Sequence, residues 1–161
     1  MEYPVKLSLY SILSSALILI VLLVLLYSGK NSWEIYLVAG VIVALLLCVL
    51  IYMPLSISVN NHELNINRSF KVKTILLSEI KSIELCPLTI AERRICGSGG
   101  FFGYWGWFRE KDLGKYFAYH GKSSDRFFVR LKDGRQYMLG CENPKAIVSY
   151  IDSLTNTPLF K

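Results

Sequence analysis

Two apolar stretches of membrane-spanning length stand near the start of the chain. They cover residues 7–27 and 35–53, and neither contains a charged residue. At about 1.5 Å per residue in an α-helix, each is long enough to cross the hydrocarbon core of a bilayer, which is about 30 Å thick. Because only the short connection SGKNSWE separates them, the two helices must run antiparallel. The sequence therefore predicts a transmembrane helical hairpin over residues 1–53.

Aromatic and basic residues orient this hairpin. Rings that favour the headgroup level mark the ends of both stretches: Tyr3, Tyr10, Tyr27, Trp33, Tyr36 and Tyr52. The connection carries only Lys30, whereas the opposite side carries Lys6 and, further along, the basic residues of 68–73. Because the flanks richer in Lys and Arg stay in the cytosol, we expect both termini there.

Small residues recur four positions apart in each stretch. They are Ser11 and Ser15 in the first and Gly40 and Ala44 in the second, and they predict close packing of the two helices. Neither stretch contains an ionisable Asp, Glu, Lys, Arg or His, which argues against a transporter or a proton path.

Alternation of apolar and polar residues begins directly after Pro54 and predicts short strands. The expected strands cover residues 55–59, 64–67, 72–77, 80–85, 115–120, 126–132 and 135–140. Asp133-Gly134 lies between the last two, which is a strong signal for a β-hairpin. We expect one small domain over residues 54–158, followed by a tail at 159–161.

A helical pattern closes the domain. Asn143 is a suitable N-cap, and Pro144 suits the first helical position. Apolar residues then follow helical spacing at Ile147, Val148, Ile151 and Leu154, so one face of the helix can pack on the sheet. The expected fold is a two-helix transmembrane hairpin followed by a mostly antiparallel β partial barrel with one C-terminal α-helix.

The formal net charge of +6 belongs to this domain. Of the 18 Lys and Arg and the 12 Asp and Glu, two of each lie before Pro54 and cancel. A basic domain held beside a membrane suits anionic lipid headgroups. The sequence contains no clustered basic helix, so we expect no nucleic-acid partner.

Metal binding and catalysis have little support in the sequence. No two of the four cysteines form a C-x-x-C pair, and His62 lies far from His120. We therefore expect reduced cysteines, no metal and no cofactor. The glycine-rich turn after Cys96 lacks the Lys-Ser/Thr of a P-loop, and it is not a G-x-S-x-G motif. The paired carboxylates Glu110 and Asp112 lie among basic residues, which is typical of a solvated charge cluster. We therefore expect no enzymatic activity.

The stretch Gly97–Phe108 combines aromatic residues with glycines. Six of its twelve residues are aromatic and most others are glycine, which is too much glycine for a core strand and too many rings for a disordered tail. We expect an ordered loop or irregular hairpin whose rings either cover the barrel or anchor a membrane or partner. Trp105 and Trp107 share one side of an extended segment, which is our candidate binding surface. The candidate interaction residues are Phe101, Phe102, Tyr104, Trp105, Trp107 and Phe108.

Several runs resemble a known family. The segments LSISVNNHELNINRSF and TILLSEIKSIEL are similar to the opening strands of bacterial PH-like (pleckstrin-homology-type) domains that follow a pair of transmembrane helices. The segments RRICGSGGFFGYWGWFREKDLGKYFAYHG and DRFFVRLKDGRQYMLGCENPKAIVSYI are similar to the later half. The resemblance covers roughly residues 54–154. It implies a strongly bent sheet plugged by a C-terminal helix, and a non-catalytic binding or scaffolding module at the inner (cytoplasmic) membrane of a bacterium.

The resemblance also bears on lipid binding. Eukaryotic PH domains bind phosphoinositides through Lys and Arg in the first hairpin, but the corresponding turn here, Asn60-Asn61-His62, carries neither. The candidate contacts to generic anionic lipids are therefore Arg68, Lys71 and Lys73, at the rim of a strand pair near the membrane.

Three functional hypotheses follow. The first is a membrane-tethered PH-like module for protein interaction or scaffolding, without catalysis. The second is a sensor of anionic lipid headgroups, and the third is a small integral-membrane enzyme. The expected partners are the lipid bilayer and a membrane or cytosolic protein, and a homo-oligomer stays open.

Overall fold

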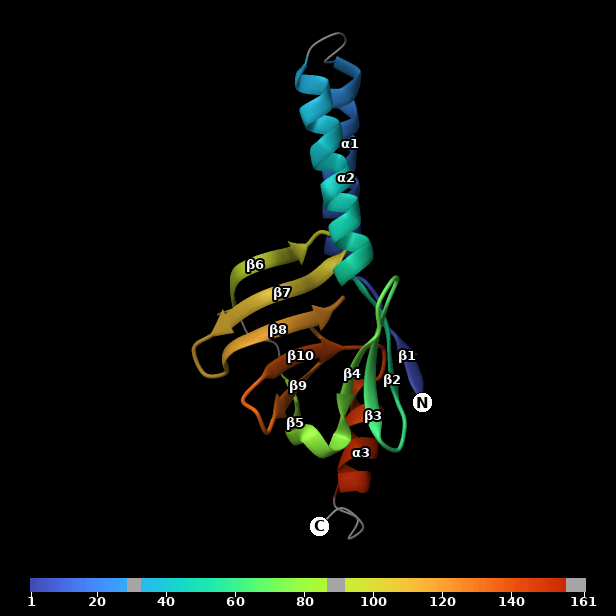
Figure 1. The fold of residues 1–161 in the computed structure, drawn as a ribbon, viewed down its shortest axis with the longest axis vertical. Helices are drawn as coiled ribbons and strands as arrows, with labels where there is room; N and C mark the ends of the chain where they lie inside the picture. Colours follow the sequence, from blue (N-terminus) through green and yellow to red (C-terminus); the bar gives the residue numbers. More distant parts are fainter. Residues whose placement is uncertain (29–32, 87–91, 156–161) are drawn as a thin grey trace.

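Two long helices stand on a β domain (Figure 1). The computed structural model describes residues 1–28, 33–86 and 92–155. Helix α1 covers Leu9–Ser28 and α2 covers Glu34–Tyr52, close to the two predicted stretches. Both helices are long and apolar enough to cross a membrane. The described parts of the hairpin therefore match the sequence-based expectation.

A short strand that the sequence pattern did not reveal precedes the first helix. Strand β1, Glu2–Pro4, pairs antiparallel with β2, Pro54–Val59. The amino group of Met1 donates a hydrogen bond to the carbonyl oxygen of Val59 at 2.8 Å, and Val5 belongs to the hydrophobic core of the domain. The chain thus forms part of the domain before it enters α1, and it returns to the domain after α2.

The first of two sheets has the order β1-β2-β3-β4. Strand β3 covers Glu63–Arg68 and β4 covers Lys73–Leu76, and all pairs in this sheet are antiparallel. The predicted alternation is confirmed, because Ile57, Leu64 and Ile66 are fully buried. A 3-10 helix, η1, covers Leu77–Glu79 and connects this sheet to the second one, so β4 is shorter than predicted.

The second sheet has the order β5-β9-β10-β8-β7-β6. Its strands in chain order are β5 Ile80–Leu85, β6 Arg93–Gly100, β7 Gly103–Glu110, β8 Gly114–His120, β9 Arg126–Leu131 and β10 Gln136–Gly140. All pairs are antiparallel except β8 with β10, which are parallel. The parallel pair arises because β10 inserts between β9 and β8. The expectation of a mostly antiparallel β domain is confirmed.

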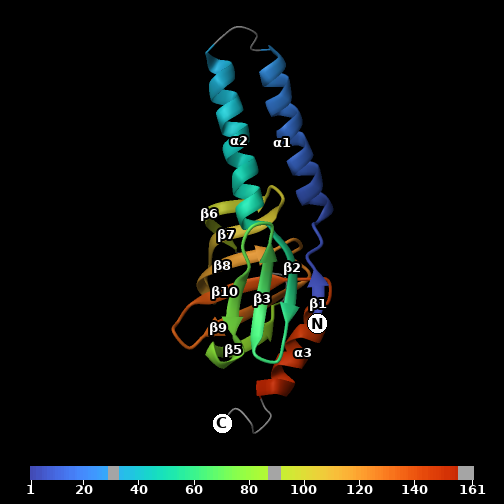
Figure 2. The same cartoon turned by 45° about the vertical axis from the view of Figure 1, so that its right-hand side comes forward.

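The C-terminal helix α3, Pro144–Thr155, packs on β5, η1 and β9 (Figure 2). The side-chain oxygen of Asn143 accepts a hydrogen bond from the amide of Ala146 at 3.2 Å, so Asn143 is the N-cap that the sequence predicted. Ile147 and Ile151 are fully buried in the core shared by both sheets. The helix therefore covers the core, as expected for a PH-like fold.

The glycine-rich stretch forms a hairpin of two eight-residue strands, β6 and β7. Of the two predicted forms, an ordered loop or an irregular hairpin, the structure contains the hairpin, with a register shift between Arg94 and Cys96. The expectation that so much glycine excludes a strand is wrong. Gly97 and Gly106 face each other, with φ of +124° and +120°. A Cβ at either position would lie 2.2–2.3 Å from a carbonyl oxygen of the other strand. Glycine at these two positions therefore allows β6 and β7 to approach each other closely.

Serines of α1 contact the β domain. Ser15 is 4% exposed, and its hydroxyl oxygen accepts a hydrogen bond from the amide of Phe102 at 2.8 Å. On α2, a Cβ added to Gly40 would meet no described atom within 4 Å. The expectation that Gly40 mediates close helix packing is therefore wrong. The small serines of α1 instead let the β6–β7 turn approach this helix.

Candidate membrane-facing site

The candidate site lies where the two helices meet the domain. The amide of Ser8 donates to the carbonyl oxygen of Gly121 at 3.1 Å, and the guanidinium of Arg68 donates to the carbonyl oxygen of Ile51 at 3.4 Å. In the six-stranded sheet, β6 is the edge strand nearest to the helices (Figure 1). If the helices cross a bilayer, this side of the domain faces it. We define the helix-side surface as a set of exposed residues of β6, β7, β8 and the β3–β4 turn: Phe70, Lys71, Val72, Arg93, Ile95, Trp107, Arg109 and Lys115.

An aromatic cluster joins α2 to the sheet. Tyr52, the last residue of α2, stacks on Trp105 with ring centroids 5.5 Å apart and an interplanar angle of 9°. Tyr52 also stacks on Phe117 at 6.5 Å, and Phe117 contacts the ring of Trp107 edge-on at 5.2 Å. Trp105 and Trp107 therefore lie on the same side of the sheet, beside the end of the helix. Tyr119 extends the cluster, with its ring centroid 4.7 Å from that of Phe117, so aromatic residues from α2, β7 and β8 meet here.

The six candidate residues of the aromatic stretch differ in exposure. Trp107 is 40% exposed, whereas Trp105 is 9% and Phe108 is 3% exposed. Tyr104 stacks on His120 at 4.8 Å. Phe101 and Phe102 are half-buried at the turn beside α1, with their rings edge-on at 5.0 Å. The rings of Trp105 and Phe108 thus add to the packed interior, and Trp107 remains as an exposed candidate anchor.

The three residues predicted to contact lipid also differ in their surroundings. Arg68 lies over the ring of Tyr119 at 5.5 Å, and Lys73 lies over the ring of Tyr137 at 4.8 Å. Lys71 is exposed in the β3–β4 turn, between Phe70, 75% exposed, and Val72, 50% exposed. Arg68 and Lys73 therefore pack on the domain's own rings. The turn itself presents one cation between two apolar side chains.

A second group of cations was not predicted from the sequence. Arg93 lies opposite Arg109, and Arg109 lies opposite Lys115, so three like charges cross β6, β7 and β8 in one row. With Arg94 and Ile95, these residues line a depression of about 580 Å³. Among the described residues, no carboxylate forms an ion pair with any of these cations. The row depends on strand register, which the order of residues alone does not reveal.

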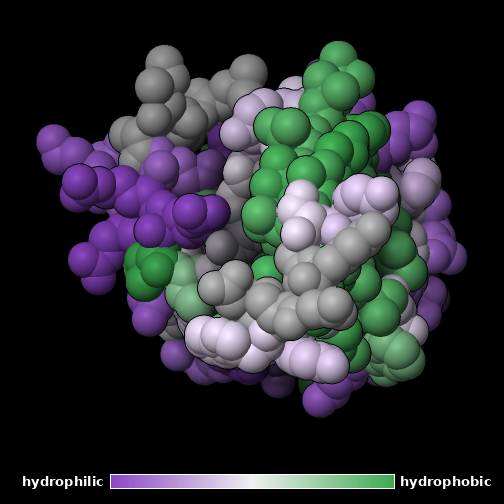
Figure 3. All heavy atoms as spheres, turned by 90° about the horizontal axis from the view of Figure 1, so that it is seen from above, coloured by the Kyte–Doolittle hydropathy of each residue, from purple (hydrophilic) through white to green (hydrophobic). Residues whose placement is uncertain are grey.

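Figure 3 looks down on this side from the helices. Hydrophilic side chains gather beside the apolar helical pair, over the side of the domain to which β6, β7 and β8 extend (Figures 1 and 3). The ammonium group of Lys115 lies over the ring of Trp107 at 4.4 Å. The helix-side surface therefore combines cations with exposed apolar groups, as a surface at the lipid headgroup level would.

The opposite face of the six-stranded sheet contains a buried polar cluster. Arg126, 1% exposed, forms an ion pair with Glu92 at 3.0 Å, and Glu92 also accepts a hydrogen bond from the hydroxyl of Tyr116 at 2.7 Å. Burial and this hydrogen bond raise the pKa of Tyr116 far above its ordinary value. Burial, helped by the charge of Arg126, lowers the pKa of His120 to about 3. The cluster is centred on an ion pair in the interior, and the described residues contain no group of three metal-ligating side chains.

Two apolar helices, two open and mostly antiparallel sheets and one C-terminal helix define a class: a PH-like partial barrel joined to a helical hairpin. The family model of the bacterial PH domain matches residues 55–154, more than half of the chain, and the chain therefore belongs to the bacterial PH domain family. The resemblance seen in the sequence is confirmed. No curated protein and no solved structure matches this chain significantly. PH-like domains are generally non-catalytic modules.

Proposed function

We propose that this protein is a non-catalytic, membrane-tethered module whose helix-side surface docks on the anionic surface of the inner membrane. The observation that carries the proposal is the row of Arg93, Arg109 and Lys115 across three neighbouring strands. Like charges directly opposite each other destabilise a sheet. An anionic membrane surface neutralises the row, so docking removes this cost.

The apolar part of the surface supports the same proposal. Ile95 is 51% exposed, Trp107 is 40% exposed and Phe70 is 75% exposed. Large apolar side chains gathered on one side of a domain mark an interaction surface, and tryptophan favours the headgroup level of a bilayer. Cations and apolar groups would thus contact phosphates and the upper acyl region together.

Because the helices tether the domain to the membrane, weak contacts are enough for it to dock. Each Lys or Arg close to an anionic leaflet contributes about 1 kcal/mol, so three or four of them would hold a free domain only loosely. Here the helices keep the domain at the bilayer, and docking becomes an intramolecular step at high effective concentration. The domain therefore docks with few contacts, and its response to lipid charge is graded.

Hydrogen exchange of the full-length protein in nanodiscs tests this proposal. Nanodiscs of phosphatidylcholine are compared with nanodiscs that also contain phosphatidylglycerol. We expect slower amide exchange in β6 and in the β3–β4 turn when the anionic lipid is present. High salt should reduce this difference, because exposed charges are screened.

Two matched triple variants complete the experiment. Arg93→Gln, Arg109→Gln and Lys115→Gln together remove the row and should abolish the lipid-dependent difference. Lys81→Gln, Lys132→Gln and Lys145→Gln remove the same charge from exposed positions elsewhere and should preserve it. Equal exchange of the wild type in both membranes would refute docking, as would equal effects of the two triple variants.

Protein interaction or scaffolding is a second candidate, supported by an open sheet edge. Strand β4 pairs only with β3 among the described strands, and Leu76 on it is 42% exposed. An extended segment of a partner can add to such an edge. Affinity purification of the intact protein in detergent should then recover a partner, and Leu76→Glu should lose it while Lys132→Glu retains it.

A further inference from the structure

A cavity lies between the helical hairpin and the edge of the sheet. It has a volume of about 340 Å³ and reaches both helices and strand β6. Helix α1 contributes Tyr10, Ser14 and Ile18, and α2 contributes Leu45. Arg94 and the glycine-rich residues 97–100 of β6 form the side toward the domain.

The lining of this cavity is amphiphilic. Ile18 lies nine residues beyond the first residue of α1, which is about 14 Å along the helix axis. Together with Leu45, it makes an apolar wall that rises away from the domain. Arg94 belongs to β6, so its charge stays at the level of the domain surface. An apolar wall above a cation fits a ligand with an acyl chain and an anionic group.

The position of Arg94 keeps its guanidinium at the cavity. Its side chain lies along the neighbouring glycine, since a Cβ at Gly99 would be 3.3 Å from Nη1 of Arg94. Among the described residues, no carboxylate forms an ion pair with Arg94. Arginine binds phosphate oxygens in a bidentate manner, and these bonds strengthen where water is partly excluded. Arg94 is therefore suited to a phosphodiester at the membrane boundary.

Glycine keeps the cavity open from the side of the sheet. At Gly100, a Cβ would lie 3.0 Å from the ring of Tyr10 and 3.5 Å from the hydroxyl oxygen of Ser14. Because residues 97, 99 and 100 carry no side chains, the space below the helices stays free. The glycines of β6 therefore leave room for the cavity above the strand and also allow the close contact with β7.

We propose that this cavity binds one anionic phospholipid, with its phosphate on Arg94 and an acyl chain along Ile18 and Leu45. The inference rests on the proposed function in one respect: the helices must lie in a bilayer with anionic lipid. It adds a single, stoichiometric site to the diffuse docking surface. The occupant is a lipid and not a free phosphate compound, because the wall above Arg94 is apolar.

Native mass spectrometry of the full-length protein tests the site. The protein is released from micelles that contain equal amounts of phosphatidylglycerol and phosphatidylcholine with the same acyl chains. We expect one phosphatidylglycerol to remain bound per chain. Arg94→Gln should weaken its retention at least tenfold relative to phosphatidylcholine, whereas Lys132→Gln should leave it unchanged.

Two further measurements test whether the bound phosphate belongs to a lipid and whether lipid binding needs the free space of the cavity. Gly99→Leu, at a position without positive φ, fills the cavity and should lower retention of both lipids. Soluble glycerol phosphate should not displace the bound lipid. Displacement by glycerol phosphate, or retention by Arg94→Gln equal to that of the wild type, would overturn the proposal.

The two proposals fail in different ways. Loss of the lipid-dependent exchange difference in β6, with one phosphatidylglycerol still bound, would refute surface docking and leave the cavity site intact. An unchanged exchange difference with no retained lipid would refute the cavity site alone. A melting temperature near that of the wild type for Arg94→Gln confirms that any loss of lipid is not a loss of folding.

Discussion

At the scale of single residues, backbone conformation explains the glycine-rich stretch better than composition does. Gly97 and Gly106 face each other with positive φ, and each leaves no space for a Cβ. Gly99 in the same strand has no such backbone constraint, and its Cβ would meet only the flexible side chain of Arg94. Glycines that look alike in the sequence therefore have different structural roles.

The first prediction compares two of these glycines. We expect Gly106→Ala to destabilise the protein by about 2–5 kcal/mol, because the Cβ clashes with backbone and the left-handed φ adds strain. Gly99→Ala should change stability by less than about 1 kcal/mol, since a long side chain can move away. Thermal unfolding in detergent measures both. Equal melting temperatures would show that β6 and β7 do not approach as described.

The second prediction concerns the buried His120. It is fully buried, and its folded-state pKa of about 3 lies below the ordinary value of 6.5. The unfolded chain therefore binds a proton that the folded protein does not, and stability falls as pH drops below 6.5 toward 3. The loss approaches about 1.4 kcal/mol per pH unit, or about 2 kcal/mol at pH 5.

His120→Phe removes this dependence, so its stability should vary less between pH 7 and pH 5 than that of the wild type. Chemical unfolding at the two pH values measures the difference. His62→Gln is the control, because His62 is exposed and its replacement should leave the wild-type slope. The same slope in His120→Phe and the wild type would contradict the burial of a neutral imidazole.

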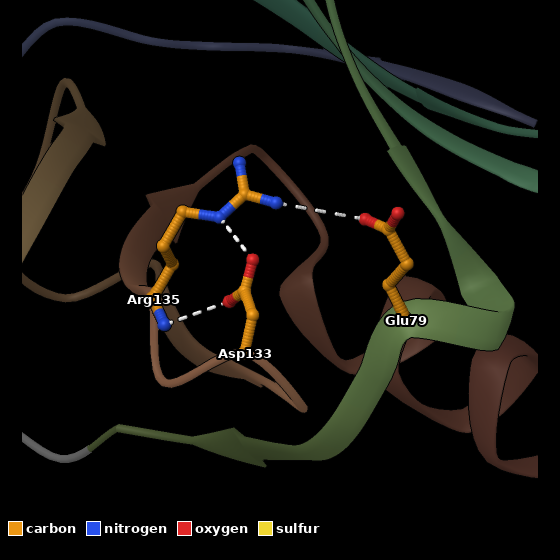
Figure 4. Close-up of polar contacts among 3 residues, drawn as sticks. All are labelled: Glu79, Asp133 and Arg135. Carbon is orange, nitrogen blue, oxygen red and sulfur yellow. Dashed lines mark hydrogen bonds and ion pairs between the residues drawn. The ribbon is translucent and has the colours of Figure 1, made fainter.

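At the scale of elements, turns with a defined backbone requirement were predictable. The β9–β10 connection contains Asp133-Gly134, and Gly134 has a φ of +88°. The amide of Leu131 donates to the carbonyl oxygen of Arg135 at 2.9 Å, which closes the turn. Arg135 contacts Asp133 and reaches Glu79 at 3.8 Å, so the turn also meets η1 (Figure 4).

The third prediction tests this turn. We expect Gly134→Val to cost about 1–3 kcal/mol, because a β-branched residue is strained at positive φ. A Cβ there meets no described atom within 4 Å, so the cost comes from the backbone alone. Lys132→Ala, at an exposed neighbour, should cost only about a few tenths of a kcal/mol. Identical unfolding curves for the two variants would disprove the turn assignment.

At the scale of the whole molecule, contacts at both ends of the hairpin attach it to the β domain. The chain leaves the domain through Ser8, which bonds to Gly121, and returns through Tyr52, which stacks on Trp105. The ion pair between Lys6 and Glu142 adds a further contact beside the first exit. Both chain segments that flank the hairpin therefore lie on the same side of it.

The fourth prediction follows from this arrangement and the distribution of Lys and Arg. We expect both termini in the cytosol, so a reporter that is active only outside the cytosol should stay silent when fused after Lys161. The same reporter fused after Ser28, the last residue of α1, should be active. Strong activity of the fusion after Lys161 would invert the orientation and place the helix-side surface on the outer leaflet.

The sequence by itself determined the elements that rest on local patterns. Uninterrupted apolar runs define the two helices, alternation defines most strands, and the N-cap Asn143 marks the start of α3. Such patterns are readable because each element carries its own periodicity and end signals. The composition of the aromatic stretch predicted an ordered loop or irregular hairpin, but it did not predict the separate roles of the rings.

Only the tertiary structure decided which distant residues meet. Strand β1 is three residues long, too short for a period to show, and its pairing depends on β2 more than fifty positions away. The parallel β8–β10 pair, the row of Arg93, Arg109 and Lys115, and the cavity beside Arg94 depend on strand order and register. Register follows from how whole faces pack, because a shift of one residue would move every side chain to the other face. For this reason the row and the cavity became visible as candidate lipid contacts only in the folded molecule, whereas Lys71 and Trp107 were already candidates from the sequence.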